Sequence, residues 1–116
     1  MVIKKIFVKD DIIFVPIQII NSGDLNYDIE LIKFFSEDKK EVKRTVKQVM
    51  EMFPVYVHNE TEVVDKNKAK TQIFAFSKFT ISKDKYFKVV LYEKNGGRNV
   101  TCKLKYRDIN KAKYID

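Results

Sequence analysis

Few side chains in this 116-residue chain could carry out covalent or metal chemistry, and they are far apart in the sequence. The chain has one cysteine, Cys102, and one histidine, His58. A structural zinc site takes about four nitrogen and sulfur ligands, so this composition argues against one. A cysteine–histidine nucleophile pair stays formally possible. However, residue alternation places Cys102 on the apolar face of its strand, where a small inert thiol is expected, and His58 is expected to be a surface or structural residue.

Two pairs of adjacent carboxylates, Asp10-Asp11 and Glu37-Asp38, fall at predicted turns. Acidic residues are common at turns, where they are solvated and form local hydrogen bonds. General acid–base catalysis instead needs carboxylates held in unlike environments within a cleft. The chain also lacks the Gly-Lys-Ser/Thr of a phosphate-binding loop. We therefore expect no catalytic residue, no metal and no cofactor, and hence a protein that is not an enzyme.

The chain is basic, with a formal net charge of +7 from 23 Lys and Arg against 16 Asp and Glu. One basic stretch contains Lys39, Lys40, Lys43, Arg44 and Lys47. A second, on the outward face of the last predicted strand, contains Lys103, Lys105 and Arg107. Such residues either solvate a face and protect a sheet edge, or form a docking surface for acidic groups or phosphates. Aromatic residues predicted to be buried disfavour base stacking, which weakens the nucleic-acid interpretation.

Alternation of apolar residues with a period of two predicts strands along most of the chain. In residues 12–20, the odd positions Ile13, Val15, Ile17 and Ile19 are all β-branched, although Pro16 indicates an edge strand or a bulge. Other strands are predicted at residues 4–9, 27–35, 55–57, 71–81, 86–93 and 98–106. Residues 60–70 are predicted to be a loop, and residues 41–52 fit either a strand or a short helix. The segment after Tyr106 is expected to fray or form a short helix.

The stretch LYEKNGGRNV, residues 91–100, predicts a hairpin. Asn95, Gly96 and Gly97 suit a tight reversal because Asn and Gly adopt positive φ at little steric cost. Glu93 and Arg98 flank this turn at positions that allow an ion pair between the two strands.

These elements predict a single all-β domain over residues 1–116: a small antiparallel β-sandwich of about seven strands, immunoglobulin-like. A five-stranded barrel is the alternative. The longest apolar run, residues 12–17, is far shorter than the roughly 20 residues of a membrane helix.

Four segments of the chain resemble the C-terminal domain of the TraN family of conjugative transposons. They are YDIELIKFFSEDKKEVKRTVKQ, PVYVHN, IFAFSKFTI and YFKVVLYEKNGGRNVTCKLKYRDI. The most specific parts are the basic stretch that begins at Asp38 and the block of residues 93–98. The resemblance covers most of residues 12–109.

The resemblance implies a non-enzymatic subunit of a type IV secretion system that transfers DNA. It implies a VirB-type outer-membrane core component in the periplasm, whose β-sandwich packs with a lipoprotein and a channel-forming subunit and forms homo-oligomers in the full assembly. Family members also have a signal peptide and an N-terminal region. The residues expected to contact partners are Lys39, Lys40, Lys43, Arg44, Glu93 and Arg98. The basic charge supports the alternative of a nucleic-acid-binding module that contacts transferred DNA.

Overall fold

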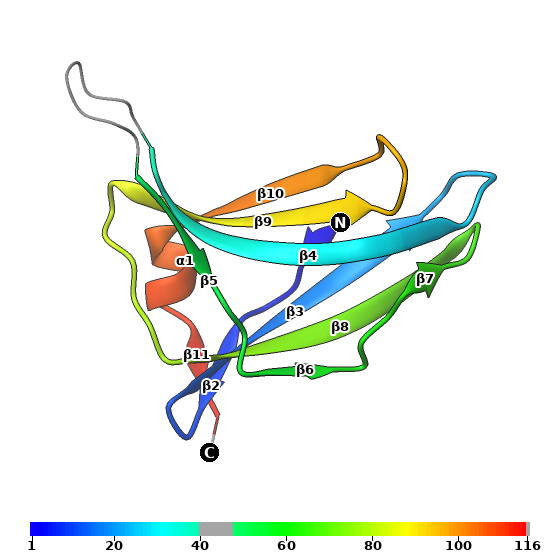
Figure 1. The fold of residues 1–116 in the computed structure, drawn as a ribbon. Coiled ribbons are helices and arrows are strands. Elements are labelled where there is room, and N and C mark those ends of the chain that lie inside the picture. Colours follow the sequence, from blue (N-terminus) through cyan, green and yellow to red (C-terminus); the bar gives the residue numbers. More distant parts are fainter. Residues whose placement is uncertain (40–47, 116) are drawn as a thin grey trace.

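Two β-sheets pack face to face in the computed structural model, which describes residues 1–39 and 48–115 (Figure 1). The first sheet has the order β11 (Lys113–Tyr114), β2 (Phe7–Lys9), β3 (Ile12–Asn21), β8 (Lys68–Ser77) and β6 (Tyr56–His58), with β1 (Val2–Ile3) also pairing with β3. The second has the order β10 (Val100–Lys105), β9 (Lys85–Glu93), β4 (Tyr27–Asp38) and β5 (Val49–Met52), with β7 (Val63–Val64) on β4. All pairings are antiparallel except β11 with β2. The predicted all-β sandwich is confirmed.

Alternating residues of both sheets fill the space between the layers, as the period of two predicts. In β3, Ile13, Val15, Ile17 and Ile19 are all buried, and in β9 the same holds for Phe87, Val89 and Leu91. Phe34 of β4 occupies the centre of this core.

Aromatic rings from the two sheets meet around Phe34. Its ring centroid lies 4.8 Å from that of Phe74 and 4.9 Å from that of Phe76, both on β8 of the opposite sheet. Phe87 of β9 lies 5.9 Å away. Such offset and edge-on pairs add to the hydrophobic stabilisation, so this cluster joins the two layers.

Pro16 does not mark an edge strand, which was one of the two alternatives that the sequence indicated. The pairing shifts register beside it, because Ile3 pairs with Ile17 whereas Phe7 pairs with Phe14, and this agrees with the other alternative, a bulge. β3 lies inside its sheet, with β8 on one side and with β1 and β2 on the other. The carbonyl of Pro16 accepts a hydrogen bond from the Lys4 N–H at 2.8 Å. In antiparallel pairing, the nitrogen of a residue points to the same side as its carbonyl. The missing N–H of Pro16 therefore faces the break between β1 and β2, where the chain leaves the ladder.

Only Phe7–Lys9 of the strand predicted at residues 4–9 form a strand, because residues 4–6 lie in that break, and β1 is an additional strand before it. Together with other short strands, it raises the number of strands in the described residues to eleven, where about seven were predicted. The predicted loop at residues 60–70 contains β7, whose Val64 is fully buried. Residues 49–52 form a strand, and residues 41–47 of the ambiguous segment lie outside the described residues.

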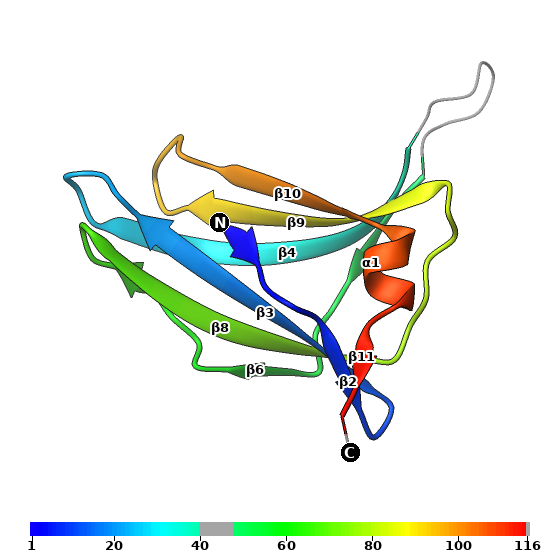
Figure 2. The same ribbon diagram turned by 180° about the vertical axis from the view of Figure 1, so that it is seen from behind.

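A short helix, α1 (Tyr106–Asn110), covers one end of the sandwich (Figure 2). This agrees with the helical alternative for the C-terminal segment, although Tyr106 begins the helix and does not end the preceding strand. Ile109 buries its side chain in the core, and the Asn110 amide exchanges hydrogen bonds with the backbone of Ile81 at 3.1 and 3.3 Å.

Candidate interaction surfaces

The hairpin between β9 and β10 forms as predicted, but the glycines act differently from expectation. Cys102 pairs with Val89, and the register holds along the two strands. Of the three turn residues only Asn95 has a positive φ, of 53°. Gly96 is needed for space, because a Cβ there would collide with the Glu93 carboxylate, whereas a Cβ on Gly97 would meet nothing within 4 Å. The expectation that both glycines supply positive φ is therefore wrong.

Arg98 binds Glu93, as the flanking positions predicted. Arg98 Nε donates to Glu93 Oε2 at 2.7 Å, and the Arg98 backbone N–H donates to Oε1 at 3.1 Å. Arg98 Nη2 also donates to the carbonyl of Asn26 at 3.0 Å, and the guanidinium lies 5.0 Å above the Tyr27 ring. The Tyr27 hydroxyl donates in turn to the Arg98 carbonyl. This cluster ties the hairpin tip to the start of β4, which gives Arg98 a structural role.

The cluster changes the acidity of its members. The hydrogen bond from Arg98 lowers the pKa of Glu93 below its ordinary value, and the same bond raises the pKa of Arg98. Burial raises the pKa of the Tyr27 phenol, and the nearby Glu93 charge adds to this effect. The hairpin tip is thus most stable when Glu93 is ionised and Tyr27 is neutral.

The basic stretch lies only partly within the described residues. Lys39 packs its ammonium against two tyrosine rings, at 5.1 Å from the centroid of Tyr86 and 5.8 Å from that of Tyr106. Before it, Asp38 accepts a hydrogen bond from Lys85 Nζ at 2.7 Å. The other basic residues of this stretch lie outside the described residues: Lys40, Lys43, Arg44 and Lys47.

A buried carboxylate lies beside the second basic stretch, where the sequence predicted a solvated turn. Glu37 is the penultimate residue of β4 and is only 6% exposed. It accepts a hydrogen bond from Lys88 Nζ at 3.1 Å, and Lys103 Nζ lies 3.6 Å away. The turn prediction for Glu37 and Asp38 is therefore wrong. Lys103 and Lys105 are exposed on edge strand β10, in agreement with edge protection, but Arg107 belongs to α1.

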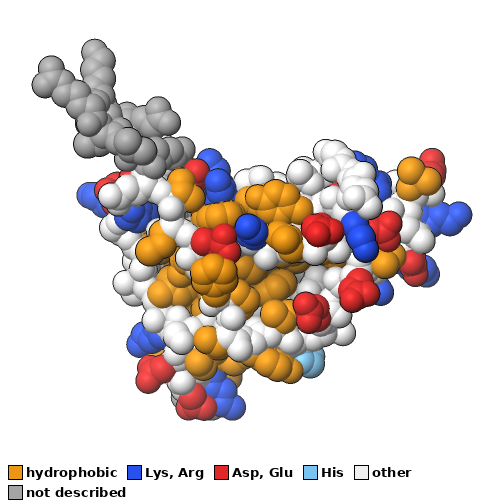
Figure 3. Space-filling model, viewed as in Figure 1, with side chains coloured by type: hydrophobic (Ala, Val, Ile, Leu, Met, Phe, Trp, Pro, Cys, Tyr) orange, Lys and Arg blue, Asp and Glu red, His pale blue; other side chains and the backbone are white. Residues whose placement is uncertain are grey.

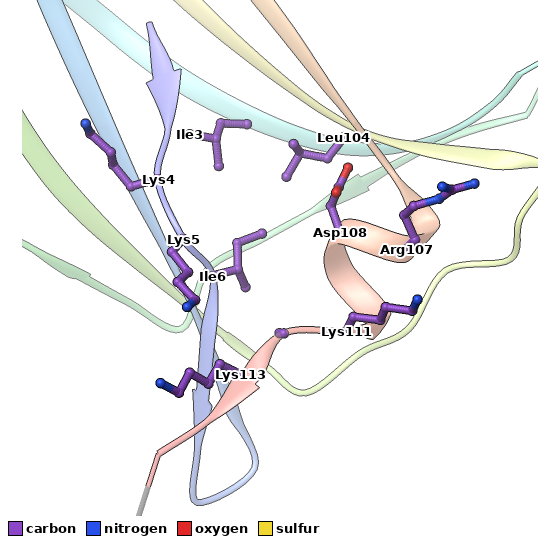
Figure 4. A pocket seen from close by; sticks show the side chains of 10 residues that line it. Ile3, Lys4, Lys5, Ile6, Leu104, Arg107, Asp108, Lys111 and Lys113 are labelled. Atoms are coloured by element: carbon purple, nitrogen blue, oxygen red, sulfur yellow. The ribbon is translucent and has the colours of Figure 1, made fainter.

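A basic hollow lies between the N-terminal segment and α1, with a cavity volume of about 410 Å³ (Figure 4). Ile3, Ile6 and Leu104 border its interior. Five cationic residues surround it: Lys4, Lys5, Arg107, Lys111 and Lys113. In Figure 4, Lys4 and Arg107 point outward on opposite sides of the hollow, so the positive charge lies mainly around its rim.

Exposed apolar side chains gather where the chain crosses from β5 to β6. Phe53 is 72% exposed and Tyr56 is 60% exposed. The full set, here called the β5–β6 apolar patch, is Val49, Met50, Phe53, Val55 and Tyr56. This surface was not predicted from the sequence. The dense apolar run around Pro54 was an available signal, because proline has no backbone N–H to donate and so tends to interrupt a strand.

In the described part of the chain, the residues capable of covalent or metal chemistry are not brought together. His58 lies on β6 of the first sheet and Cys102 on β10 of the second, where its Sγ is 3.5 Å from the Met1 carbonyl. Within residues 1–39 and 48–115, no group of three or more His, Cys, Asp or Glu side chains is arranged to hold a metal ion. The same residues contain no helix of the length and apolarity that crossing a membrane requires.

The fold and these surfaces define an all-β sandwich domain with exposed apolar and charged faces. The chain belongs to the family described as a domain of unknown function, DUF4138, which matches residues 1–114. No curated protein matches the chain.

Proposed function

We propose that this domain is a non-enzymatic structural and interaction domain of a conjugative DNA-transfer apparatus. It acts by protein contacts within the outer-membrane core complex of a type IV secretion system, in the periplasm. The observation that carries the proposal is the β5–β6 apolar patch, because large apolar side chains exposed together in one short segment, residues 49–56, are typical of protein interaction sites. The TraN resemblance of residues 12–109 supplies the identity of the apparatus.

The partners proposed are a lipoprotein and a channel-forming subunit of the same apparatus, together with further copies of this chain in the full assembly. Aromatic residues at the centre of an interface commonly contribute most of its binding energy. Phe53 and Tyr56 are therefore the anchors of the proposed contact. Lys39, Lys40, Lys43 and Arg44 would add charged contacts, and contacts of this kind affect association rate more than affinity.

Binding of the purified domain to the purified lipoprotein and channel-forming subunit tests this proposal. Phe53→Ser should weaken binding at least about tenfold, since anchor residues contribute about 2 kcal/mol or more. Leu25→Ser is the matched control, because Leu25 is 71% exposed but lies outside the patch. Charge reversal at Lys43 and Arg44 should lower the association rate. Absence of binding by the unaltered domain to either subunit would refute the proposal.

The basic hollow favours a second candidate function, a nucleic-acid-binding module that contacts transferred DNA. Five cationic residues around one hollow could contact several phosphates. Against this function, Lys39 and Lys103 already lie over the Tyr86 ring, which leaves that ring less open to base stacking.

Titration with single-stranded DNA at low and high salt distinguishes the two functions. A nucleic-acid module binds at low salt, and its affinity falls steeply as salt rises. The double change Lys5→Glu and Lys111→Glu should then abolish binding. The absence of binding at low salt would reject this second function.

A further inference from the structure

A groove separates the two sheets on the side where β4 faces β6, next to the β5–β6 apolar patch. Its cavity volume is about 1020 Å³. One wall is formed by β4 at residues 28–32, and the other by Val57 of β6 and by Gln72 and Phe74 of β8. Figure 3 views this side and shows hydrophobic side chains gathered between the sheets, with acidic side chains beside them. Partly buried side chains that pack against the core, Ile29, Ile32 and Val57, thus line this side.

The groove is bordered by strand edges that have no neighbour in the described residues. On this side β4 pairs with β7 through Tyr27 and Asp28, the Ile29 N–H donates to the Glu62 carbonyl at 2.8 Å, and β4 pairs with β5 from Phe34 onward. Within the described residues, only residues 30–33 of this stretch have no strand partner on this side. β6 pairs with β8 alone. Each sheet therefore presents a short free edge to the same groove, and free edges readily accept another strand.

The position of Pro54 explains why the pairing of β4 with β5 stops where it does. Phe34 pairs with Met52, so continuing the same register would place Ile32 opposite Pro54. Proline has no N–H to donate, and the chain crosses to the other sheet at this point. The Asp38 N–H donates to the Gln48 carbonyl on the β5 side. The backbone N–H and C=O of every second residue in a strand point to the same side. Ile32 and Asp38 are an even number of positions apart in β4, so the N–H and C=O of Ile32 also point to the β5 side, which is the side of the groove.

A buried amide lies at the inner end of the groove. Gln72 is 2% exposed, and its Oε1 accepts a hydrogen bond from the Thr61 N–H at 3.3 Å. Its Nε2 has no hydrogen-bond partner among the described residues. Buried donors of this kind are normally satisfied. Gln72 shares its strand face with Phe74, which points into the core, so the Gln72 side chain lies between the sheets, where it lines the groove.

The groove is acidic although the chain as a whole is basic. Four carboxylates line it: Asp28, Glu30, Glu60 and Glu62. Other carboxylates of the two sheets form ion pairs, as Glu51 does with Lys33 at 3.5 Å. Within the described residues, no such pair is formed by any of these four, and Lys94 is the one cationic residue that lines the groove. An occupant with positive charge would therefore fit its electrostatics.

We propose that this groove binds an extended, basic segment of a partner protein that adds a short strand at the β4 edge. The Ile32 backbone would pair with the segment, apolar side chains would cover Ile29, Ile32 and Val57, and lysine or arginine would meet Glu30 and Glu62. Addition of a strand to a free edge is a common mode of peptide recognition. The inference rests on the proposed function, because it assigns one partner contact to this interaction domain.

Short synthetic peptides test the inference directly. A peptide that alternates valine and lysine should bind the domain and shift the amide resonances of Ile32 and Tyr56. A peptide that alternates valine and glutamate should bind at least about tenfold more weakly, and so should the valine–lysine peptide with a central proline. Failure of the valine–lysine peptide to bind, or equal binding of all three peptides, would overturn the inference.

Variants of the domain locate the site. The double change Glu30→Lys and Glu62→Lys should reduce affinity for the valine–lysine peptide at least about tenfold. Asp24→Lys is the matched control, because Asp24 is exposed and lies outside the groove. Unfolding midpoints of both variants establish that they fold. If the apparatus subunits bind the double variant as tightly as the unaltered domain, this inference is refuted but the proposed function is not. If they do not bind the unaltered domain, the proposed function falls.

Discussion

Arg98 binds Glu93 twice, through its side-chain Nε at 2.7 Å and through its own backbone N–H at 3.1 Å. The two residues flank the β9–β10 turn, so this pair closes the tip of the hairpin. Arg98 reaches further to the Asn26 carbonyl and so joins the tip to the start of β4. Charge reversal at Arg98 would therefore disturb the local structure as well as any partner contact, which makes Lys43 and Arg44 the better probes of binding.

Gly96→Ala should destabilise the hairpin more than Gly97→Ala does. An added Cβ at position 96 would overlap the Glu93 carboxylate and push it away from Arg98, whereas position 97 has open space. We expect a lower urea midpoint for Gly96→Ala and a nearly unchanged midpoint for Gly97→Ala. Adding Glu93→Ala removes the collision, so Gly96→Ala should then cost little further. Equal effects of the two glycine changes in the unaltered background would contradict this explanation.

Acid should lower the folding stability of the domain, partly because Glu93 becomes protonated. The Arg98 hydrogen bond lowers the pKa of Glu93 in the folded state below the value of 4.5 expected when unfolded. A lowered folded-state pKa adds stability that is present above the unfolded pKa and is lost as pH falls toward the folded one. Urea midpoints of Glu93→Gln should therefore fall less than those of the unaltered domain between about pH 5 and about pH 3.

Other acidic groups also contribute to the loss of stability in acid. Asp84 also has a lowered pKa, because Ser82 donates a hydrogen bond to it, and its effect is the same in both proteins. Parallel pH profiles for the unaltered domain and Glu93→Gln would show that the Arg98 pair contributes nothing to acid sensitivity.

Phe34→Ala should cause one of the largest losses of stability among single changes in the core. Phe34 is 1% exposed and contacts rings of both sheets. The cavity left behind should lower the free energy of unfolding by about 3–5 kcal/mol. Phe53→Ala, at a 72% exposed position, should change it by no more than about 0.5 kcal/mol. Chemical denaturation measures both, and a similar loss for the two variants would contradict the central role of Phe34.

Lys88→Met should destabilise the domain more than Lys103→Met. Lys88 donates to buried Glu37 at 3.1 Å from a side chain that is 20% exposed, whereas Lys103 lies at 3.6 Å with 44% of its side chain exposed. We expect a loss of about 1–3 kcal/mol for Lys88→Met and at most about 1 kcal/mol for Lys103→Met. Denaturant titration at neutral pH decides this, and the reverse order would show that Glu37 depends mainly on Lys103.

Features governed by neighbouring residues in the chain were predictable from the sequence. The alternation in β3 and β9 indicates which side chains face the core, because side chains of a strand point alternately to its two faces. The β9–β10 hairpin and its Glu93–Arg98 pair follow in the same way from residues a few positions apart. The all-β sandwich follows from the number of such segments.

Features that depend on distant segments were missed. Glu37 resembles a turn residue in sequence, yet it is buried because Lys88 and Lys103 reach it from β9 and β10. Pro16 is tolerated within a sheet only because β1 and β2 separate beside it. The acidic groove combines residues of β4 with residues of β6 and β8, and no local pattern connects them.

Photo-crosslinking in cells that carry the whole transfer apparatus tests whether this domain acts through protein contacts. A photoreactive residue placed at position 53, in the β5–β6 apolar patch, should form covalent adducts with another subunit of the apparatus. The same residue at position 25, equally exposed but outside the patch, should form few. Adducts of similar yield from both positions, none from position 53, or adducts with nucleic acid alone would contradict the claim that this domain acts through protein contacts.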